Sequence, residues 1–171
     1  MTKKEFVYLV LAMRAYFPKE KTFLETDQAI ELWYFQLKDL DFKVAEAALN
    51  KWAATNKWSP TIADIRELAT SISMGELPDW GEAWEQLTQA IRRYGSYRAG
   101  EALDSLSPLC RKTVERLGYL QLCASENIAA DRANFRMIYE QLQQREKQQA
   151  QLPEGLKILI AQMQQGTLIE G

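Results

Sequence analysis

The sequence predicts an all-α protein in which a small N-terminal helical bundle precedes a second helical region and a short C-terminal amphipathic helix. Apolar residues recur at spacings of three and four along almost the whole chain, which is the period of amphipathic helices. The alternation typical of strands and the Asn-Gly type of hairpin turn are both missing. The chain has 171 residues, 47% of them hydrophobic, so it is long enough to bury a core in one domain or two small ones.

Four helices are expected in the first 74 residues. Thr2 and Glu5 fit a capping box at the start of the first helix, and Pro18 stops that helix. The second helix follows Thr26 or Asp27, both of which are good N-cap residues.

The third helix is expected to begin at Asp41, which can cap it. The fourth follows the break at Pro60, where Thr61 and Asp64 resemble a capping pair. Four helices with short loops form a plausible small bundle. The expected apolar faces are Phe6, Leu9, Val10 and Met13; Ile30, Trp33, Tyr34 and Leu37; Val44, Ala45, Ala48, Leu49 and Trp52; and Ile62, Ile65, Leu68, Ala69 and Ile72.

Gly and Pro within residues 74–78 mark the best candidate domain boundary. The predicted division is an N-terminal bundle over 1–74, a linker over 75–78, a second helical region over 79–149 and a tail over 150–171.

The second region is expected to begin with another capping box, Asp79 with Glu82, and its first helix ends at Gly95, a natural C-cap. That helix carries the apolar residues Trp80, Ala83, Trp84, Leu87, Ile91 and Tyr94. Cap and break residues then predict a short helix over 100–106, a helix from Ser107-Pro108 to Gly118, and a turn around 119–123. A long helix is expected after Ser125 or Asn127. The residues on its apolar face are Ile128, Phe135, Ile138, Tyr139 and Leu142.

From Gln141 to Gln151 the chain is rich in Gln, Glu and Lys, so this part of the long helix is expected to be exposed to solvent. Pro153 and Gly155 are expected to break the helix. The tail then becomes apolar again at helical spacing, at Leu156, Leu159, Ile160 and Met163.

Residue types that carry out catalysis are scarce. The chain has no histidine, which removes the commonest general base and metal ligand, and it has no phosphate-binding loop or Gly-x-Ser-x-Gly pattern. Cys110 and Cys123 are interpreted as buried small hydrophobic residues rather than as a disulfide, a reactive thiol or a zinc site. Asp39 and Asp41 are interpreted as a turn and an N-cap rather than a magnesium site. We therefore expect no enzyme activity and no cofactor.

The N-terminus superficially resembles a signal peptide, because Lys3 and Lys4 precede the apolar run 6–13. Glu5 in the basic region and Arg14 at the end of the run argue against this interpretation, and no small-x-small cleavage site follows. The run is too short to span a bilayer, so we expect an intracellular protein with no membrane contact.

The strongest local concentration of positive charge lies between Arg92 and Arg98. Because the net charge is −2, any contact with nucleic acid must come from such a patch. Arginine can bind phosphates and tyrosine can stack on bases. The candidate nucleic-acid-binding residues are Arg92, Arg93, Tyr94, Tyr97 and Arg98. The competing interpretation is that arginines favour the C-terminal end of a helix dipole while both tyrosines are half-buried. Arg111, Lys112 and Arg116 would extend the patch if they share its surface.

The tail is a second candidate surface, with Leu156, Leu159, Ile160 and Met163 as the candidate partner-binding residues. Its apolar face either docks into a groove of a partner or folds back onto its own domain. Lys157 is its only basic residue, which disfavours a membrane surface. Trp58 lies beside the break at Pro60, so it is the tryptophan most expected to be exposed. We favour packing of its ring against its own loop over a role as an interaction hot spot.

Four stretches of the first half are distinctive in their order and spacing: the leading Thr-Lys-Lys-Glu-Phe, residues 29–34, residues 37–41, and Trp-Ser-Pro-Thr-Ile-Ala-Asp-Ile-Arg at 58–66. Over roughly residues 1–73 they resemble the N-terminal domain of the replicative helicase loader/inhibitor family of phages that infect Gram-positive bacteria. The second half resembles the longer phage and prophage members at 79–84, 92–95 and 125–127.

This resemblance implies that the N-terminal domain is a small helical bundle. It also implies that the protein binds the hexameric replicative DNA helicase, holds it inactive, and helps to load it at the phage origin through an origin-binding initiator protein. In the short family members a flexible C-terminal region contacts the helicase, and Leu156–Met163 is its counterpart by position. Such loaders have no ATPase of their own and act in the cytoplasm of the bacterial host.

We therefore expect a non-enzymatic adaptor of DNA replication whose partners are the helicase and the initiator, with a possible weak DNA contact. The first alternative is a DNA-binding replication or regulatory protein that uses the Arg92–Arg98 patch. A phage structural or assembly protein is the second alternative, and an enzyme is the third.

Overall fold

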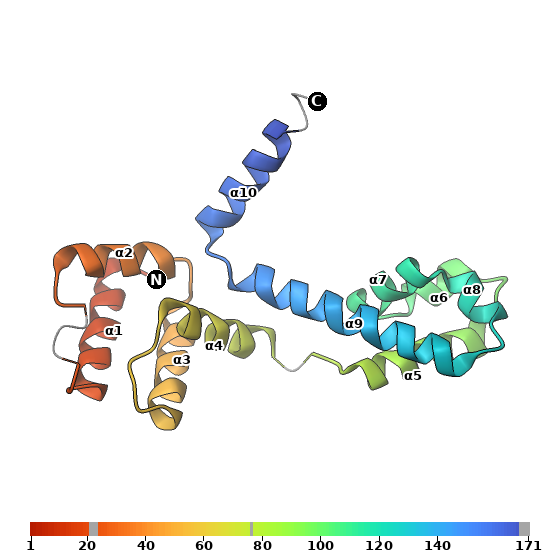
Figure 1. The fold of residues 1–171 in the computed structure, drawn as a ribbon, viewed down its shortest axis with the longest axis horizontal. Coiled ribbons are helices and arrows are strands. Elements are labelled where there is room, and N and C mark those ends of the chain that lie inside the picture. The colour runs from red at the N-terminus through yellow and green to blue at the C-terminus, as the bar shows by residue number, and fades with distance from the viewer. Residues whose placement is uncertain (21–23, 76, 168–171) are drawn as a thin grey trace. The chain divides into compact units, whose positions relative to one another are not determined.

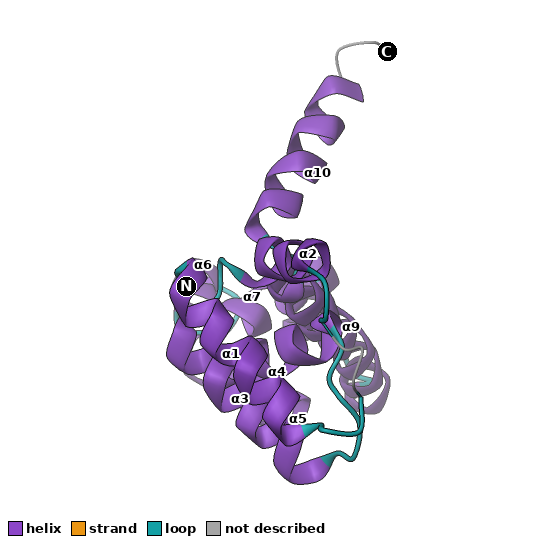
Figure 2. Cartoon of the chain, turned by 90° about the vertical axis from the view of Figure 1, so that its left-hand side faces the viewer, coloured by secondary structure: helices purple, strands orange, loops and turns teal. Residues whose placement is uncertain are grey.

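The computed structural model describes residues 1–20, 24–75 and 77–167, with side chains up to residue 164. Within these ranges the chain forms ten helices and no strand (Figures 1 and 2), which confirms the predicted all-α fold. None of the helices in the described part of the chain is long and apolar enough to cross a membrane. The chain divides into two compact units, one of residues 1–75 with 149–171 and one of residues 76–148.

The N-terminal bundle consists of α1 (Lys3–Tyr16), α2 (Asp27–Leu37), α3 (Phe42–Thr55) and α4 (Ile62–Met74) (Figure 1). Each helix begins at an N-cap whose side chain accepts backbone N–H bonds, namely Thr2, Thr26, Asp41 and Thr61. The two capping boxes predicted for this bundle are both complete, with Glu5 in α1 and Asp64 in α4.

Apolar side chains from all four helices form the core of this bundle. The ring of Phe6 packs against that of Tyr34, with 5.5 Å between the ring centroids. The fully buried members are Phe6, Leu9, Val10, Met13, Leu24, Leu37, Ala45, Leu49 and Ile65.

The buried face of α4 differs from the one predicted. Ile72 is 38% exposed, whereas Arg66 and Thr70 are buried. A charged residue can occupy this face because Arg66 has an anionic partner there, which compensates for its loss of hydration.

The second unit contains α5 (Trp80–Tyr94), α6 (Ala99–Asp104), α7 (Pro108–Leu117), α8 (Tyr119–Ala124) and most of α9 (Ile128–Gln151). The capping box of Asp79 with Glu82 is confirmed, and Gly95 ends α5 with a φ of 60°. The predicted short helix over 100–106 begins and ends earlier than expected, as α6.

The turn predicted around 119–123 is wrong, because these residues form α8. Tyr119 is buried, and its hydroxyl donates a hydrogen bond of 3.0 Å to the carbonyl of Gly95. The backbone N–H of Leu122 bonds to the carbonyl of Gly118 at 3.1 Å. Packing against a residue distant in the sequence therefore stabilises a helix too short to form alone.

Aromatic side chains of α9 form the centre of the second core. Phe135 packs edge-on against Trp84, with centroids 5.3 Å apart, and stacks on Tyr139 at 5.8 Å. The Tyr139 hydroxyl donates to the carbonyl of Pro78 at 2.8 Å, so this buried phenol is satisfied. Cys110 is buried and Cys123 is half-buried, and both are free thiols. Burial raises the pKa of the Cys110 thiol to about 12.

After the break at Pro153 the chain forms α10 (Glu154–Thr167). Gly155 was expected to contribute to the break, but it lies in the first turn of α10. Glycine keeps its backbone N–H and C=O groups, so it breaks no helical hydrogen bond, and its entropic cost of about 1 kcal/mol is small enough to be tolerated at a helix start.

We expect the core of the second unit to be sensitive to cavities. Replacing the fully buried Leu87 with alanine should lower the free energy of unfolding by about 2–5 kcal/mol. Denaturant unfolding followed by circular dichroism measures this loss. Met137→Ala on exposed α9 surface is the control and should change stability little; equal effects of the two substitutions would contradict the assigned core.

Candidate functional site

Helix α10 presents its predicted apolar face to solvent. Leu156, Leu159, Ile160 and Met163 are each between 36% and 65% exposed. Their spacing places them on one side of the helix, while Ile158, also exposed, lies on another side. Lys157 pairs with Glu154 at 3.4 Å, so the basic residue of the tail has an anionic neighbour. Exposed apolar side chains gathered on one helix face are typical of a protein-binding surface.

A partly buried ion pair, which was not predicted from the sequence, lies at the base of this helix. Arg66 is only 4% exposed. Its guanidinium donates two hydrogen bonds of 2.8 Å to the two carboxylate oxygens of Asp39. This fork geometry is the strong, bidentate form of an arginine–carboxylate pair. We call Arg66 and Asp39 together the Arg66 clasp.

The clasp also binds the ends of three helices. Arg66 Nη1 donates to the carbonyl of Gln36, near the end of α2, at 2.6 Å, and Nε donates to the carbonyl of Gln151, the last residue of α9. Asp39 Oδ2 accepts a hydrogen bond of 3.2 Å from the backbone N–H of Glu154, the first residue of α10. These backbone groups have no partner within their own helices, so the clasp satisfies them.

The carboxyl of Asp39 is ionised in this environment. Burial is the largest single influence and raises its pKa, but hydrogen bonds from Arg66, the charge of Arg66 and the Glu154 N–H outweigh it and hold the pKa below its ordinary value. The pair therefore stabilises the fold above the ordinary carboxyl pKa, and this contribution is lost as the pH falls through the lowered value.

The two aspartates around Leu40 thus have different roles. Asp41 accepts N–H bonds from Lys43 and Val44 and caps α3, as predicted. Asp39 was interpreted as a turn residue but is the partner of Arg66. The available signal was a single arginine on the apolar face of α4, directly after Ile65. Among the described residues, no three His, Cys, Asp or Glu side chains gather closely enough to hold a metal ion.

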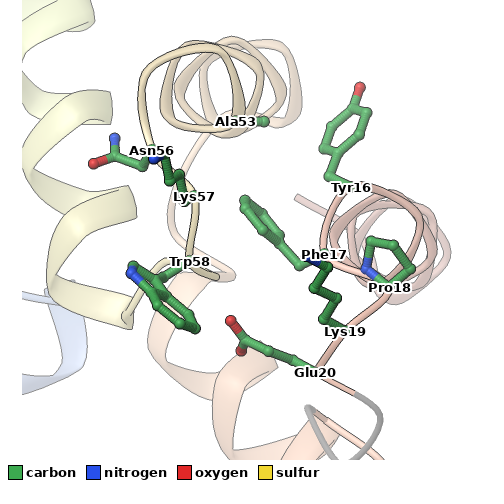
Figure 3. Close-up of a pocket in the computed structure, with 9 residues that line it drawn as sticks. All are labelled: Tyr16, Phe17, Pro18, Lys19, Glu20, Ala53, Asn56, Lys57 and Trp58. Atoms are coloured by element: carbon green, nitrogen blue, oxygen red, sulfur yellow. The ribbon is translucent and has the colours of Figure 1, made fainter.

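A groove of about 440 Å³ lies between the C-terminal ends of α1 and α3. Figure 3 shows Phe17, Trp58 and Glu20 directed toward the same hollow. Trp58 is 74% exposed, so the expectation that it packs against its loop is wrong. The loop is instead held through the backbone of Trp58, whose carbonyl accepts a hydrogen bond of 2.9 Å from the Trp52 indole N–H. This bond anchors the loop without covering the Trp58 ring.

The rim of the groove carries both signs of charge. The Glu20 carboxylate accepts hydrogen bonds from the backbone N–H of Ser59, at 2.9 Å, and from the Ser59 hydroxyl. The hydroxyl bond first, and then the backbone bond, lower the pKa of Glu20. Lys19 and Lys57 also line the groove. An exposed tryptophan with an apolar floor and a polar rim has the composition of a protein-binding hot spot.

Several side chains of the Arg92–Arg98 patch interact with one another. The guanidinium groups of Arg93 and Arg98 lie over the Tyr94 ring, 5.3 and 5.2 Å from its centroid. Arg98 also donates to the carbonyl of Arg93 at 2.8 Å, near the end of α5. Tyr94 is half-buried, whereas Tyr97 is fully exposed. Arg92 is exposed too, so Arg92 and Tyr97 are the members that remain most accessible.

Two of the cations considered as an extension of this patch are neutralised locally. Arg111 pairs with Asp104 at 2.7 Å and with Glu115 at 2.8 Å. Lys112 pairs with Glu146 at 2.6 Å. These pairs reduce the positive potential that α7 could add to the patch.

The comparisons with known proteins concern the N-terminal bundle. Residues 1–66 match the family model of the N-terminal domain of the phage SPP1 helicase loader/inhibitor. This confirms the family resemblance of that segment. No curated protein and no solved structure matches the chain. The groove and both members of the Arg66 clasp lie inside the matched segment, whereas α10 and the Arg92–Arg98 patch lie outside it.

Proposed function

We propose, starting from an N-terminal domain of the phage SPP1 helicase loader/inhibitor family, that this chain is a non-enzymatic adaptor for a replicative DNA helicase. In this role it binds the hexameric helicase, holds it inactive, and helps to load it at the phage replication origin through an origin-binding initiator. The match of residues 1–66 to the family model is the observation that carries the proposal.

The helicase contact is assigned to α10. Its face of Leu156, Leu159, Ile160 and Met163 is exposed, and helices of this kind bind by laying such a face into a partner's groove. Each large side chain moved from water into such a groove contributes favourably to binding. The position of this helix after the second helical region agrees with the C-terminal helicase contact that the family resemblance implies.

The initiator contact is assigned to the groove beside Trp58. This groove lies within the matched segment, and Trp58 displays most of its indole to solvent. Its loop is anchored by the Trp52 hydrogen bond, so binding would order few additional groups. The assignment of initiator to the bundle and helicase to α10 separates the two partners on the chain.

A DNA contact is the second candidate function, and the full exposure of Tyr97 beside Arg92 favours it. A tyrosine in this position can stack on an unpaired base while the arginine meets a phosphate. The stacking of Arg93 and Arg98 on Tyr94 limits the contribution that these two side chains make.

The α10 assignment predicts a face-specific loss of helicase binding. Leu159→Asp in the full-length chain should weaken binding to the helicase encoded by the same genome roughly ten-fold or more, because a charge is placed in the apolar contact. Binding is measured by biolayer interferometry with ATP and without it. Ile158→Asp is the matched control, with the same change on another side of the helix; equal losses in both variants would refute the assigned face.

The groove assignment predicts that Trp58→Ala weakens binding to the initiator about ten-fold, since a central exposed aromatic residue is lost. Leu32→Ala, at another exposed apolar position of the same bundle, is the control and should leave the affinity unchanged. Calorimetry with the purified initiator measures both. An initiator that binds both variants as well as the wild type would exclude this groove.

The DNA alternative predicts affinity that falls steeply with salt. Replacing Arg92, Arg93 and Arg98 with alanine should then abolish binding of single-stranded DNA in a fluorescence anisotropy titration. An unchanged titration, or no salt dependence in the wild type, would remove this alternative.

A further inference from the structure

The Arg66 clasp joins segments that are far apart in the sequence. Arg66 and Asp39 belong to the N-terminal bundle, while Gln151 and Glu154 flank the corner between α9 and α10. Two hydrogen bonds link the clasp to this corner, one from Arg66 to the Gln151 carbonyl and one from the Glu154 N–H to Asp39. The base of α10 is therefore attached to the bundle through one ion pair, in which Arg66 is buried and Asp39 is partly exposed.

An ion pair is a costly way to attach two segments if adhesion is all that is needed. Removing the Arg66 charge and part of the Asp39 charge from water offsets much of their attraction, and apolar residues of similar volume often stabilise a fold as well or better. A guanidinium makes directional contacts, whereas an apolar side chain does not, because the N–H groups of the guanidinium point along fixed lines in one plane. Four N–H···O bonds from Arg66 thus define the orientation of the groups around it.

The clasp also reaches the corner between α2 and α3. Asp39 lies in this corner, and the N-terminal ammonium of Met1 donates to the carbonyls of Lys38, at 2.6 Å, and Leu40, at 2.7 Å. The backbone on both sides of Asp39 is thereby held in place. Its carboxylate is presented to Arg66 from a fixed position.

We propose that Arg66 and Asp39 are positioning residues that hold α10 in one orientation on the N-terminal bundle, and so present its apolar face to the helicase already placed for binding. The helicase part of this inference rests on the proposed function. A helix held in its bound orientation loses less freedom on association, and its affinity rises for that reason. Releasing the clasp would leave the contact residues of α10 intact but present them in many orientations.

The test measures the position of α10 directly in the full-length chain. Nitroxide labels are placed at exposed Ala47 of α3 and Gln162 of α10, in a Cys123→Ser background. Cys110 is retained, because its buried thiol is not accessible to the label. Electron–electron double resonance then gives the distribution of distances between α3 and α10, and interferometry gives the helicase affinity.

Two variants release the clasp. Arg66→Met leaves Asp39 without its partner and is expected to cost stability. The double variant Arg66→Met with Asp39→Leu replaces both charges by apolar side chains, so the bundle should remain folded, with a melting temperature close to that of the wild type. In both variants the distance distribution should broaden, and helicase affinity should fall roughly ten-fold.

The matched control removes an ion pair that does not contact α9 or α10. Lys3 and Glu31 form an exposed pair between α1 and α2. Lys3→Met with Glu31→Leu should leave the distance distribution and the helicase affinity as in the wild type.

The possible outcomes separate the two claims. A broad distribution in the wild type, or an unchanged one in the folded double variant, overturns the positioning role. A broadened distribution with unchanged helicase affinity supports positioning and overturns its link to binding. If the wild type does not bind the helicase at all, the proposed function fails, while the distance measurement still decides whether the clasp positions α10.

Discussion

One buried guanidinium constrains the first compact unit of this protein. Arg66 can lie on the core face of α4 only because Asp39 neutralises it and because backbone carbonyls of Gln36 and Gln151 accept its remaining N–H groups. In return it satisfies carbonyls at two helix ends, and Asp39 satisfies the first N–H of α10. The packing of α4, the corner between α2 and α3, and the start of α10 therefore depend on the same side chain.

Polar and apolar side chains are treated differently in the part of the chain that the structure describes. In the N-terminal bundle, partly buried polar groups are paired, as in the clasp and in the bonds between Glu20 and Ser59 at the groove rim. At Trp58 and along one face of α10, large apolar side chains remain exposed. Large apolar side chains left exposed in this way are typical of a surface that binds other proteins. The arginine–tyrosine patch is a weaker candidate, since much of its charge interacts with its own residues.

The family match and the clasp together show how the matched N-terminal segment is linked to α10. Residues 1–66 contain the groove and both charged members of the clasp, and the match ends at Arg66. The helix that the clasp holds lies outside the matched segment. An arrangement of this kind lets a family domain keep its own core while a different C-terminal segment is attached through backbone hydrogen bonds, which do not depend on side-chain identity.

Local chemistry was sufficient for much of the fold. The helical period, the capping boxes at Thr2, Thr61 and Asp79, and the glycine at the end of α5 were all predictable, since each depends on residues within one turn. Helix α8, the partner of Asp39 and the exposure of Trp58 were decided by tertiary structure. Each depends on a group distant in the sequence or on a neighbour's backbone, and one-dimensional periodicity carries no information about which residues from different helices meet.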